Sequence, residues 1–165
     1  MTPVLPDPET LCAELVHQLR PRVTADTALV GIHTGGAWLA ERLHAALGIA
    51  LPLGLLDISF YRDDFDKTGL HPQIKPTQIP FEVDGRHIVL VDDVLYTGRT
   101  VRGAMNELFD YGRPASISLA VLIDRGGREL PVAAQYVGAR LEVPPGRMLV
   151  LDRDEHGKLR LKLDA

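Results

Sequence analysis

The 165-residue sequence has only one cysteine, Cys12, so it cannot form an internal disulfide. It also has no apolar run long enough to cross a membrane, and its first seven residues lack the basic and apolar regions of a signal peptide. We therefore expect a cytoplasmic protein with no membrane partner. Cys12 falls in a helical pattern and is most simply a small apolar core residue.

The sequence also has no overall excess of basic residues. The net charge is −4, which gives no overall case for binding nucleic acid. The balance changes along the chain, however: residues 1–124 contain 10 Lys and Arg against 16 Asp and Glu, whereas residues 125–165 contain 8 against 6. With 45% hydrophobic residues, the chain is ordinary for one globular domain with its own core.

Along the sequence, predicted strands alternate with predicted helices. Asp7 and Pro8 predict a helix start, and Gly48 a helix end. The predicted strands lack polar alternation, which favours a parallel sheet covered on both faces, an α/β fold. Residues 62–81 have no clear period, which is typical of an active-site lid or a disordered loop. The pattern predicts helices at 8–19, 36–47 and 100–111, strands at 28–33, 51–61, 87–91 and 116–124, and a hairpin at 147–163.

Three loops leave the ends of predicted strands, at His33–Gly36, Asp92–Thr100 and Asp124–Gly127. In open α/β sheets, ligands bind at the carboxyl ends of the strands, near the point where the strand order reverses. We therefore expect all three loops to face one cleft.

The stretch HIVLVDDVLYTGRT, residues 87–100, carries the most specific chemistry. Thr97 and Gly98 precede a predicted helix that begins at Thr100, and a helix N-terminus with small polar neighbours suits a phosphate. Asp92 and Asp93 cannot bind phosphate, but they accept hydrogen bonds from vicinal hydroxyls and help to bind Mg²⁺. Together they describe a ribose 5-phosphate site. The simpler interpretation is a strand with a capped turn, in which Asp93 or Thr97 is only an N-cap. The Gly-Lys-Ser/Thr of a Walker loop is absent.

Several segments resemble a known family. VLVDDVLYTGRT is similar to the signature of type I phosphoribosyltransferases. DISFYRDDF (57–65), GRPASISLAVLIDRG (112–126) and RELP (128–131) extend the resemblance to the PyrR family, over roughly residues 8–151. The resemblance implies a type I phosphoribosyltransferase fold, a parallel twisted sheet flanked by helices with a small C-terminal β hood. It implies one domain, 1–165, with a core at about 8–130, a flexible lid at about 62–80 and a hood at about 131–165.

The resemblance also implies roles for particular residues. Asp92 and Asp93 would be the catalytic pair that binds the ribose hydroxyls. The lid would carry Arg62 and Asp63, and the base would lie beside Asp124, Arg125 and Met148. The remaining ribose and 5′-phosphate ligands would be Tyr96, Thr97, Gly98, Arg99 and Thr100, and the pyrophosphate loop would be Thr34, Gly35 and Gly36.

The implied activity is that of a uracil phosphoribosyltransferase, which forms UMP and diphosphate from uracil and phosphoribosyl diphosphate. Mg²⁺ would be the cofactor, with the substrate rather than the protein supplying most of its ligands. The family also implies UMP-dependent regulation of pyrimidine genes through leader mRNA, and a homodimer or higher homo-oligomer. The RNA face would use Arg20, Arg22, Arg128, Arg140 and Arg147, together with Arg125.

Three departures from the family pattern affect charge. Gly35 stands where the pyrophosphate loop usually has arginine, Gly127 replaces a histidine, and residues 144–147 replace a Ser/Lys-rich hood segment. We therefore expect catalysis to be the main function and RNA attenuation to be weak, altered or lost. The alternatives are an RNA-binding attenuator that only senses nucleotides, and a phosphoribosyltransferase for another base.

Overall fold

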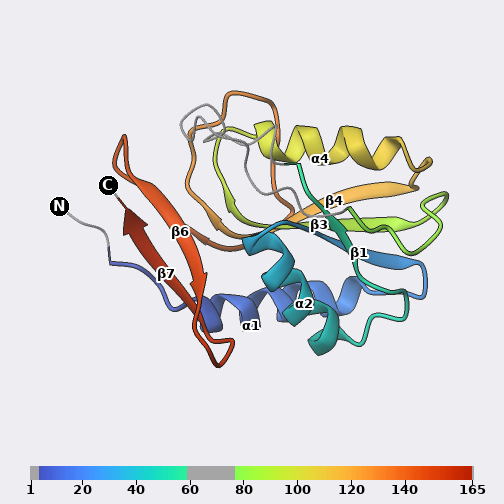
Figure 1. Ribbon diagram of the computed structural model, residues 1–165, viewed down its shortest axis with the longest axis horizontal. Helices are drawn as coiled ribbons and strands as arrows, with labels where there is room; N and C mark the ends of the chain where they lie inside the picture. The colour runs from blue at the N-terminus through green and yellow to red at the C-terminus, as the bar shows by residue number, and fades with distance from the viewer. Residues whose placement is uncertain (1–3, 59–76, 165) are drawn as a thin grey trace.

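The computed structural model describes residues 4–58 and 77–164 of the chain. Five parallel strands form the main sheet in the order β2-β1-β3-β4-β5. Helices α1 and α2 lie on one face of the sheet and α4 on the other (Figure 1). The elements are α1 (Pro8–Leu19), the short 3₁₀ helix η1 (Arg20–Arg22), β1 (Thr27–Ile32), α2 (Gly35–Leu47), β2 (Gly54–Leu56), β3 (His87–Leu95), α4 (Arg99–Phe109), β4 (Ser116–Asp124) and β5 (Tyr136–Arg140).

The predicted helix ends are confirmed. The Asp7 carboxylate accepts a hydrogen bond from the Glu9 N–H at 3.1 Å, and Pro8 takes the first helical position of α1. Gly48 ends α2 with φ +63°, the left-handed conformation that glycine adopts without steric cost. Both caps satisfy backbone groups that the helix itself leaves unpaired.

Apolar side chains cover both faces of the sheet, as the unbroken apolar strands predicted. All six residues of β1 are buried. One apolar cluster fills the space between the sheet and the pair α1 and α2, and it includes Cys12 as expected. A second cluster lies between the sheet and α4.

Three strand predictions need correction. Of the segment 51–61, expected to be extended, the described residues up to 58 form a strand only at Gly54–Leu56, β2. The sequence predicted that β3 stops at residue 91, but it continues to Leu95, so Asp92 and Asp93 belong to the strand and not to a loop. The sequence did not predict β5, which pairs with β4 and extends the main sheet to Arg140, past the core boundary expected near residue 130. Gly138 allows this pairing, because a Cβ there would lie 2.5 Å from the Leu122 carbonyl oxygen.

The predicted C-terminal hairpin is confirmed as β6 (Met148–Arg153) and β7 (Leu159–Asp164), an antiparallel pair apart from the main sheet. It stands at one end of the molecule (Figure 1). Leu149, Leu151 and Leu159 belong to the same apolar cluster as α1 and α2, so the hood packs against the core. No helix in the described part of the chain is long and apolar enough to span a membrane.

Candidate functional site

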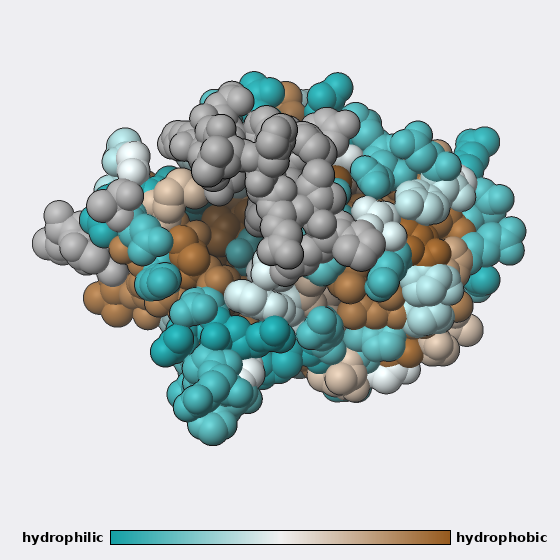
Figure 2. Space-filling model, viewed as in Figure 1, coloured by the Kyte–Doolittle hydropathy of each residue, from teal (hydrophilic) through white to brown (hydrophobic). Residues whose placement is uncertain are grey.

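A cleft of about 240 Å³ lies at the carboxyl ends of β1, β3 and β4, beneath the hood. Figure 2 shows apolar side chains recessed between the hood and the rest of the molecule. The cleft contains side chains from all three predicted loop regions. Its lining is Thr34, Gly35, Trp38, Asp92, Asp93, Val94, Tyr96, Thr100, Arg125 and the hood residues Met148, Leu149, Val150 and Leu151.

The two aspartates line this cleft side by side at the end of β3. Asp92 is only 4% exposed, and its Oδ1 accepts a hydrogen bond from the Asp93 N–H at 2.9 Å. The Asp93 Oδ1 accepts one from the Val94 N–H at 2.8 Å. These local bonds orient both carboxylates. The pair can accept hydrogen bonds from vicinal hydroxyls or contribute oxygen ligands to a cation.

The Thr34-Gly35-Gly36 loop approaches these carboxylates closely. A Cβ at Gly35 would lie 2.3 Å from Oδ2 of Asp93, and one at Gly36 would lie 2.5 Å from the Val91 carbonyl oxygen. The peptide bond between His33 and Thr34 is cis. Glycine at both positions therefore allows α2 to begin against the end of β3.

The turn that follows β3 is stabilised by hydrogen bonds from residues 128–132. The Thr97 carbonyl accepts hydrogen bonds from the N–H groups of Glu129 at 2.9 Å and Leu130 at 3.1 Å. Gly98 has φ +95° and is the N-cap residue before α4. The Thr97 hydroxyl accepts a bond from the Arg99 N–H at 3.2 Å, so Thr97 does act locally as a turn-stabilising residue. The Arg99 side chain pairs with Glu129 at 2.9 Å and does not line the cleft.

On the far side of the cleft, Asp124 and Arg125 differ in surroundings. Asp124 pairs with Arg128 at 2.6 Å. Burial raises the pKa of Asp124, but the hydrogen bonds from Arg128 and the Gly126 N–H outweigh burial, and the pKa is lowered overall. Arg125 instead lines the cleft, with its guanidinium carbon 3.9 Å from the centre of the Tyr96 ring.

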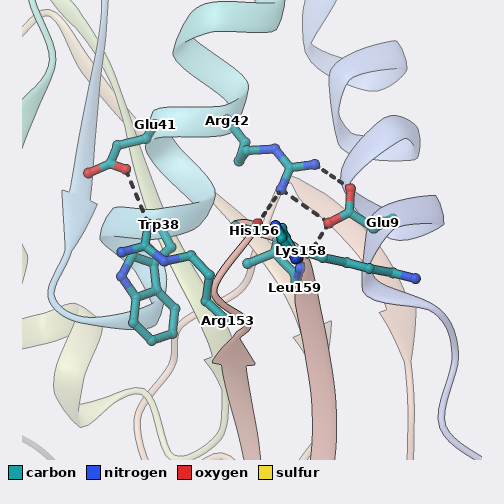
Figure 3. Close-up of a pocket in the computed structure, with 9 residues that line it drawn as sticks. Glu9, Trp38, Glu41, Arg42, Arg153, His156, Lys158 and Leu159 are labelled. Atoms are coloured by element: carbon teal, nitrogen blue, oxygen red, sulfur yellow. Dashed lines mark hydrogen bonds and ion pairs between the residues drawn. The ribbon is translucent and has the colours of Figure 1, made fainter.

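Trp38, which the sequence patterns did not single out, lines the cleft one turn after Gly35. Its signal was a lone tryptophan in a helix of small and apolar residues. The Arg153 guanidinium lies over its ring, 4.7 Å from the centre, and pairs with Glu41 at 3.7 Å. Trp38 also borders a second cavity of about 540 Å³ between the hood and helices α1 and α2 (Figure 3).

A cluster of polar contacts fixes the hood beside that second cavity. Arg42 of α2 forms an ion pair with Glu9 of α1, and its Nη1 donates to the Gly157 carbonyl at 3.3 Å. The Glu9 carboxylate accepts a further bond from the Leu159 N–H at 3.0 Å (Figure 3). We call these four residues, Glu9, Arg42, Gly157 and Leu159, the hood clasp.

The arginines of the expected RNA face do not gather at one place. Arg20 and Arg22 are exposed near the amino ends of the strands, whereas Arg140 is exposed at the carboxyl end of β5. The Arg128 guanidinium donates to Asp124 and to the carbonyls of Tyr96 and Val132, and Arg147 donates to the carbonyls of Leu163 and Asp164. Arg62 and Asp63 of the expected lid lie outside the described residues.

Comparison with known proteins identifies the family. The model of the phosphoribosyl transferase domain family matches residues 7–143. A protein from Pseudomonas syringae called bifunctional protein PyrR is 49% identical over 162 residues, which cover 96% of this chain and 95% of its own. The chain belongs to the PyrR family of phosphoribosyltransferases. A second PyrR, from Pseudomonas paraeruginosa, is 52% identical over 94% of this chain and 89% of its own.

Solved structures show the same fold. A hypoxanthine phosphoribosyltransferase from Staphylococcus aureus matches 87% of this chain and 77% of its own with a TM-score of 0.64 and 26% identity. One from Trypanosoma cruzi matches 92% of this chain and 88% of its own with a TM-score of 0.68 and 21% identity. The predicted type I phosphoribosyltransferase fold is thus confirmed, with the hood of this PyrR-family chain over the carboxyl ends of the strands.

Proposed function

We propose that this PyrR-family protein transfers the phosphoribosyl group of phosphoribosyl diphosphate to uracil, giving UMP and diphosphate. The cleft carries the proposal, because one small cavity is lined by the adjacent aspartates of β3, Thr34 and Gly35, Thr100 of α4 and the hood. Acceptors for hydroxyls, a helix N-terminus for a phosphate and an apolar wall for a base are the parts that such a transfer needs.

In this proposal, different described residues bind different parts of the substrate. Asp92 and Asp93 accept hydrogen bonds from the ribose hydroxyls, and the turn Tyr96–Thr100 binds the 5′-phosphate with N–H groups and hydroxyls. Backbone N–H groups of the loop at Gly35 face the diphosphate. These contacts orient the sugar carbon toward the base nitrogen, which converts a bimolecular step into one within the complex. No covalent bond to the protein is required.

The residues present fit Mg²⁺ bound together with its substrate. No group of three His, Cys, Asp or Glu side chains with metal-binding geometry occurs among residues 4–58 and 77–164. Two carboxylates, Asp92 and Asp93, do line the cleft, and Mg²⁺ is often bound by one or two carboxylates plus substrate phosphates. When bound, the cation neutralises the charge that develops on the leaving diphosphate.

The test is a panel of bases with phosphoribosyl diphosphate and Mg²⁺, in which diphosphate release is followed. Uracil should give the highest kcat/KM, above cytosine, xanthine and hypoxanthine. Hypoxanthine belongs in the panel because a structural relative is named for it. Release with hypoxanthine but not with uracil would replace the base assignment, and no release with any base would favour a nucleotide-sensing attenuator.

We propose UMP-dependent regulation of pyrimidine genes through leader mRNA only as a second, weaker function, because the relatives are named bifunctional but the arginines of the expected RNA face lie apart. We also propose a homo-oligomer, since an RNA face built from scattered arginines needs a second copy to widen it. Sedimentation of the purified chain with and without UMP gives its oligomeric state. A monomer under both conditions would contradict the oligomer.

A further inference from the structure

The second cavity, of about 540 Å³ between the hood and helices α1 and α2, is separate from the cleft and has no part in the proposed transfer. Its volume lies within the range of about 300–1,000 Å³ that is typical of small-molecule sites. Among the described residues, Trp38 alone borders both the cavity and the cleft. A ligand in the second cavity would therefore lie one side chain away from the cleft.

Basic side chains predominate in the lining of the second cavity. Arg42, Arg153 and Lys158 are accompanied by two carboxylates, those of Glu9 and Glu41. Arg42 and Glu9 form an ion pair and so neutralise each other. The remaining described side chains with permanent charges are two cations and one carboxylate, a local excess of positive charge that favours an anionic ligand.

The two remaining cations keep their donors free. The Arg153 guanidinium lies 3.7 Å from the Glu41 carboxylate, which is too far for a hydrogen bond, and it donates to no residue within 4–58 and 77–164. The Lys158 ammonium likewise has no hydrogen-bond or ion-pair partner in the described part of the chain. Both groups donate and cannot accept, so a ligand that pairs with them must supply oxygen acceptors.

The positions of these two cations determine the shape of the ligand. Figure 3 shows the Arg153 guanidinium beside Trp38, whereas the Lys158 side chain extends toward the side of Glu9. One compact anion cannot pair with both groups in this arrangement. A row of linked phosphates can, because it presents charged oxygens along its whole length.

We propose that the second cavity binds a polyphosphate, such as the triphosphate of a nucleotide, through Arg153 and Lys158, and that the bound polyphosphate weakens the binding of UMP in the cleft. The Arg153 guanidinium lies over the Trp38 ring, 4.7 Å from its centre, so a polyphosphate at Arg153 places negative charge beside the cleft. Like charges repel, and each ligand therefore lowers the affinity of the other by the same factor. The effect on UMP rests on the proposed function, whereas the polyphosphate site does not.

The fluorescence of Trp38, the single tryptophan of the chain, tests the site directly. The wild type is titrated with inorganic tripolyphosphate in the absence of Mg²⁺, first alone and then with saturating UMP, which fills the cleft. Tripolyphosphate should change the fluorescence and reach saturation in both titrations, with the larger Kd when UMP is present. The same titrations with ATP and UTP distinguish a nucleotide from a simple polyphosphate as the ligand. Absence of a saturable change would overturn the site.

The dependence of UMP affinity on tripolyphosphate separates two sites from one. If the two ligands occupy separate cavities, the Kd of UMP should rise about fivefold or more and then reach a plateau. If tripolyphosphate instead binds in the cleft, the Kd of UMP rises without limit as its concentration increases, and the proposal is overturned. A wild type that does not bind UMP would contradict the proposed function, and the titration with tripolyphosphate alone would still test the site.

Variants of the two cations assign the binding to the cavity. Arg153→Gln and Lys158→Gln should each weaken tripolyphosphate binding about fivefold or more, because each removes a charged donor. Isothermal titration calorimetry measures these affinities independently of the Trp38 signal. Lys162→Gln is the matched control, because Lys162 is an exposed lysine of the same hairpin and lines neither cavity. Equal affinities in the three variants would overturn the roles of Arg153 and Lys158.

Discussion

At the scale of single residues, the cleft depends on two like charges at adjacent positions. The carboxylates of Asp92 and Asp93 accept bonds from the next N–H groups along the chain, at 2.9 and 2.8 Å. Such bonds fix the orientation of both side chains. The arrangement suits a polyhydroxylated or cationic partner, which reduces the repulsion between the two charges when it binds.

We predict that Asp92→Asn and Asp93→Asn each lower kcat/KM about ten- to a hundredfold, because each removes a charged acceptor for a ribose hydroxyl. The measurement is the initial rate of diphosphate release with uracil as base. Asp110→Asn is the control, because Asp110 is exposed after the last turn of α4. Wild-type kinetics in both cleft mutants would show that the ribose binds elsewhere.

Gly126 and Gly127 provide a matched pair for a second prediction. Both have positive φ, +74° and +81°, so alanine should cost each about 1–2 kcal/mol of stability. A Cβ at Gly126 meets nothing within 4 Å, whereas one at Gly127 would lie 2.5 Å from the Tyr96 ring. We predict that only Gly127→Ala displaces Tyr96 and raises the KM for the base, while Gly126→Ala keeps wild-type kinetics.

Thermal unfolding and base titrations of both variants test this pair. Equal KM values for the base in Gly126→Ala and Gly127→Ala would mean that the Tyr96 ring moves without consequence for the cleft. The same geometry gives Gly127 a structural role in this chain. In this chain the backbone at residue 127 packs directly on the ring that supports Arg125.

At the scale of elements, the sequence predicted what depends on local pattern. The caps at Asp7 and Gly48 and the hairpin of β6 and β7 follow from residues a few positions apart. Strand β5 could not be found in this way, because its five residues include Gly138 and it forms only by pairing with β4. The length of β3 was missed for a similar reason, since aspartates disfavour strands unless a neighbouring strand and a ligand site accommodate them.

The candidate site also contains both kinds of residue, those that a local sequence pattern reveals and those that only tertiary packing brings to the cleft. The motif and the resemblance singled out Asp92, Asp93 and Arg125 beside recognisable strand ends, and the structure brings these three side chains to one cleft. Thr97, Gly98 and Arg99, singled out in the same way, do not line it. Trp38 was missed, since its approach to the cleft depends on the packing of α2 against β3 and the hood. The hydrogen bonds of the Arg128 side chain could not be predicted from the sequence either, because they join residues up to 32 positions apart.

The hood clasp gives a prediction about pH and the hood. The hydrogen bond from Arg42 lowers the pKa of Glu9 despite partial burial. A carboxyl whose pKa is lower in the folded state stabilises the fold above its unfolded pKa, and this stabilisation is lost as the pH falls through the folded pKa. We predict that Glu9→Gln lowers the stability at pH 7 by at most about 1 kcal/mol, since the pair is partly exposed.

The difference between wild type and Glu9→Gln should shrink as the pH is lowered from 7 to about 3, because Glu9 then becomes protonated. Urea unfolding at several pH values measures it. Glu155→Gln is the control, because Glu155 is 87% exposed at the tip of the hairpin. A difference that stays constant over this pH range would mean that the clasp acts through packing and not through the charge of Glu9.

At the scale of the whole molecule, the distribution of arginines bears on RNA. Binding to RNA depends mainly on Lys and Arg contacts to phosphates, so it weakens steeply with salt. The chain is net acidic, and the basic excess of residues 125–165 amounts to two charges. Arg20 and Arg22 lie at the opposite end of the sheet from Arg140, and Arg128 and Arg147 already donate to groups of the protein itself.

We therefore predict weak binding of the organism's own pyrimidine-operon leader RNA at physiological salt, near the affinity range of about 10⁻⁴ to 10⁻⁶ M that is typical of non-specific binding. A filter-binding titration with and without UMP measures it.

Arg140→Ala is the informative variant, because Arg140 is exposed and makes no contact with the cleft, whereas Arg128→Ala would also disturb Tyr96 and Asp124. If Arg140 contacts a phosphate, its removal lowers the slope of log affinity against log salt by about one. Tight, UMP-enhanced binding that Arg140→Ala abolishes, with uracil kinetics unchanged, would contradict the prediction. It would mean that two copies of the chain bring their separated arginines together into one RNA-binding face.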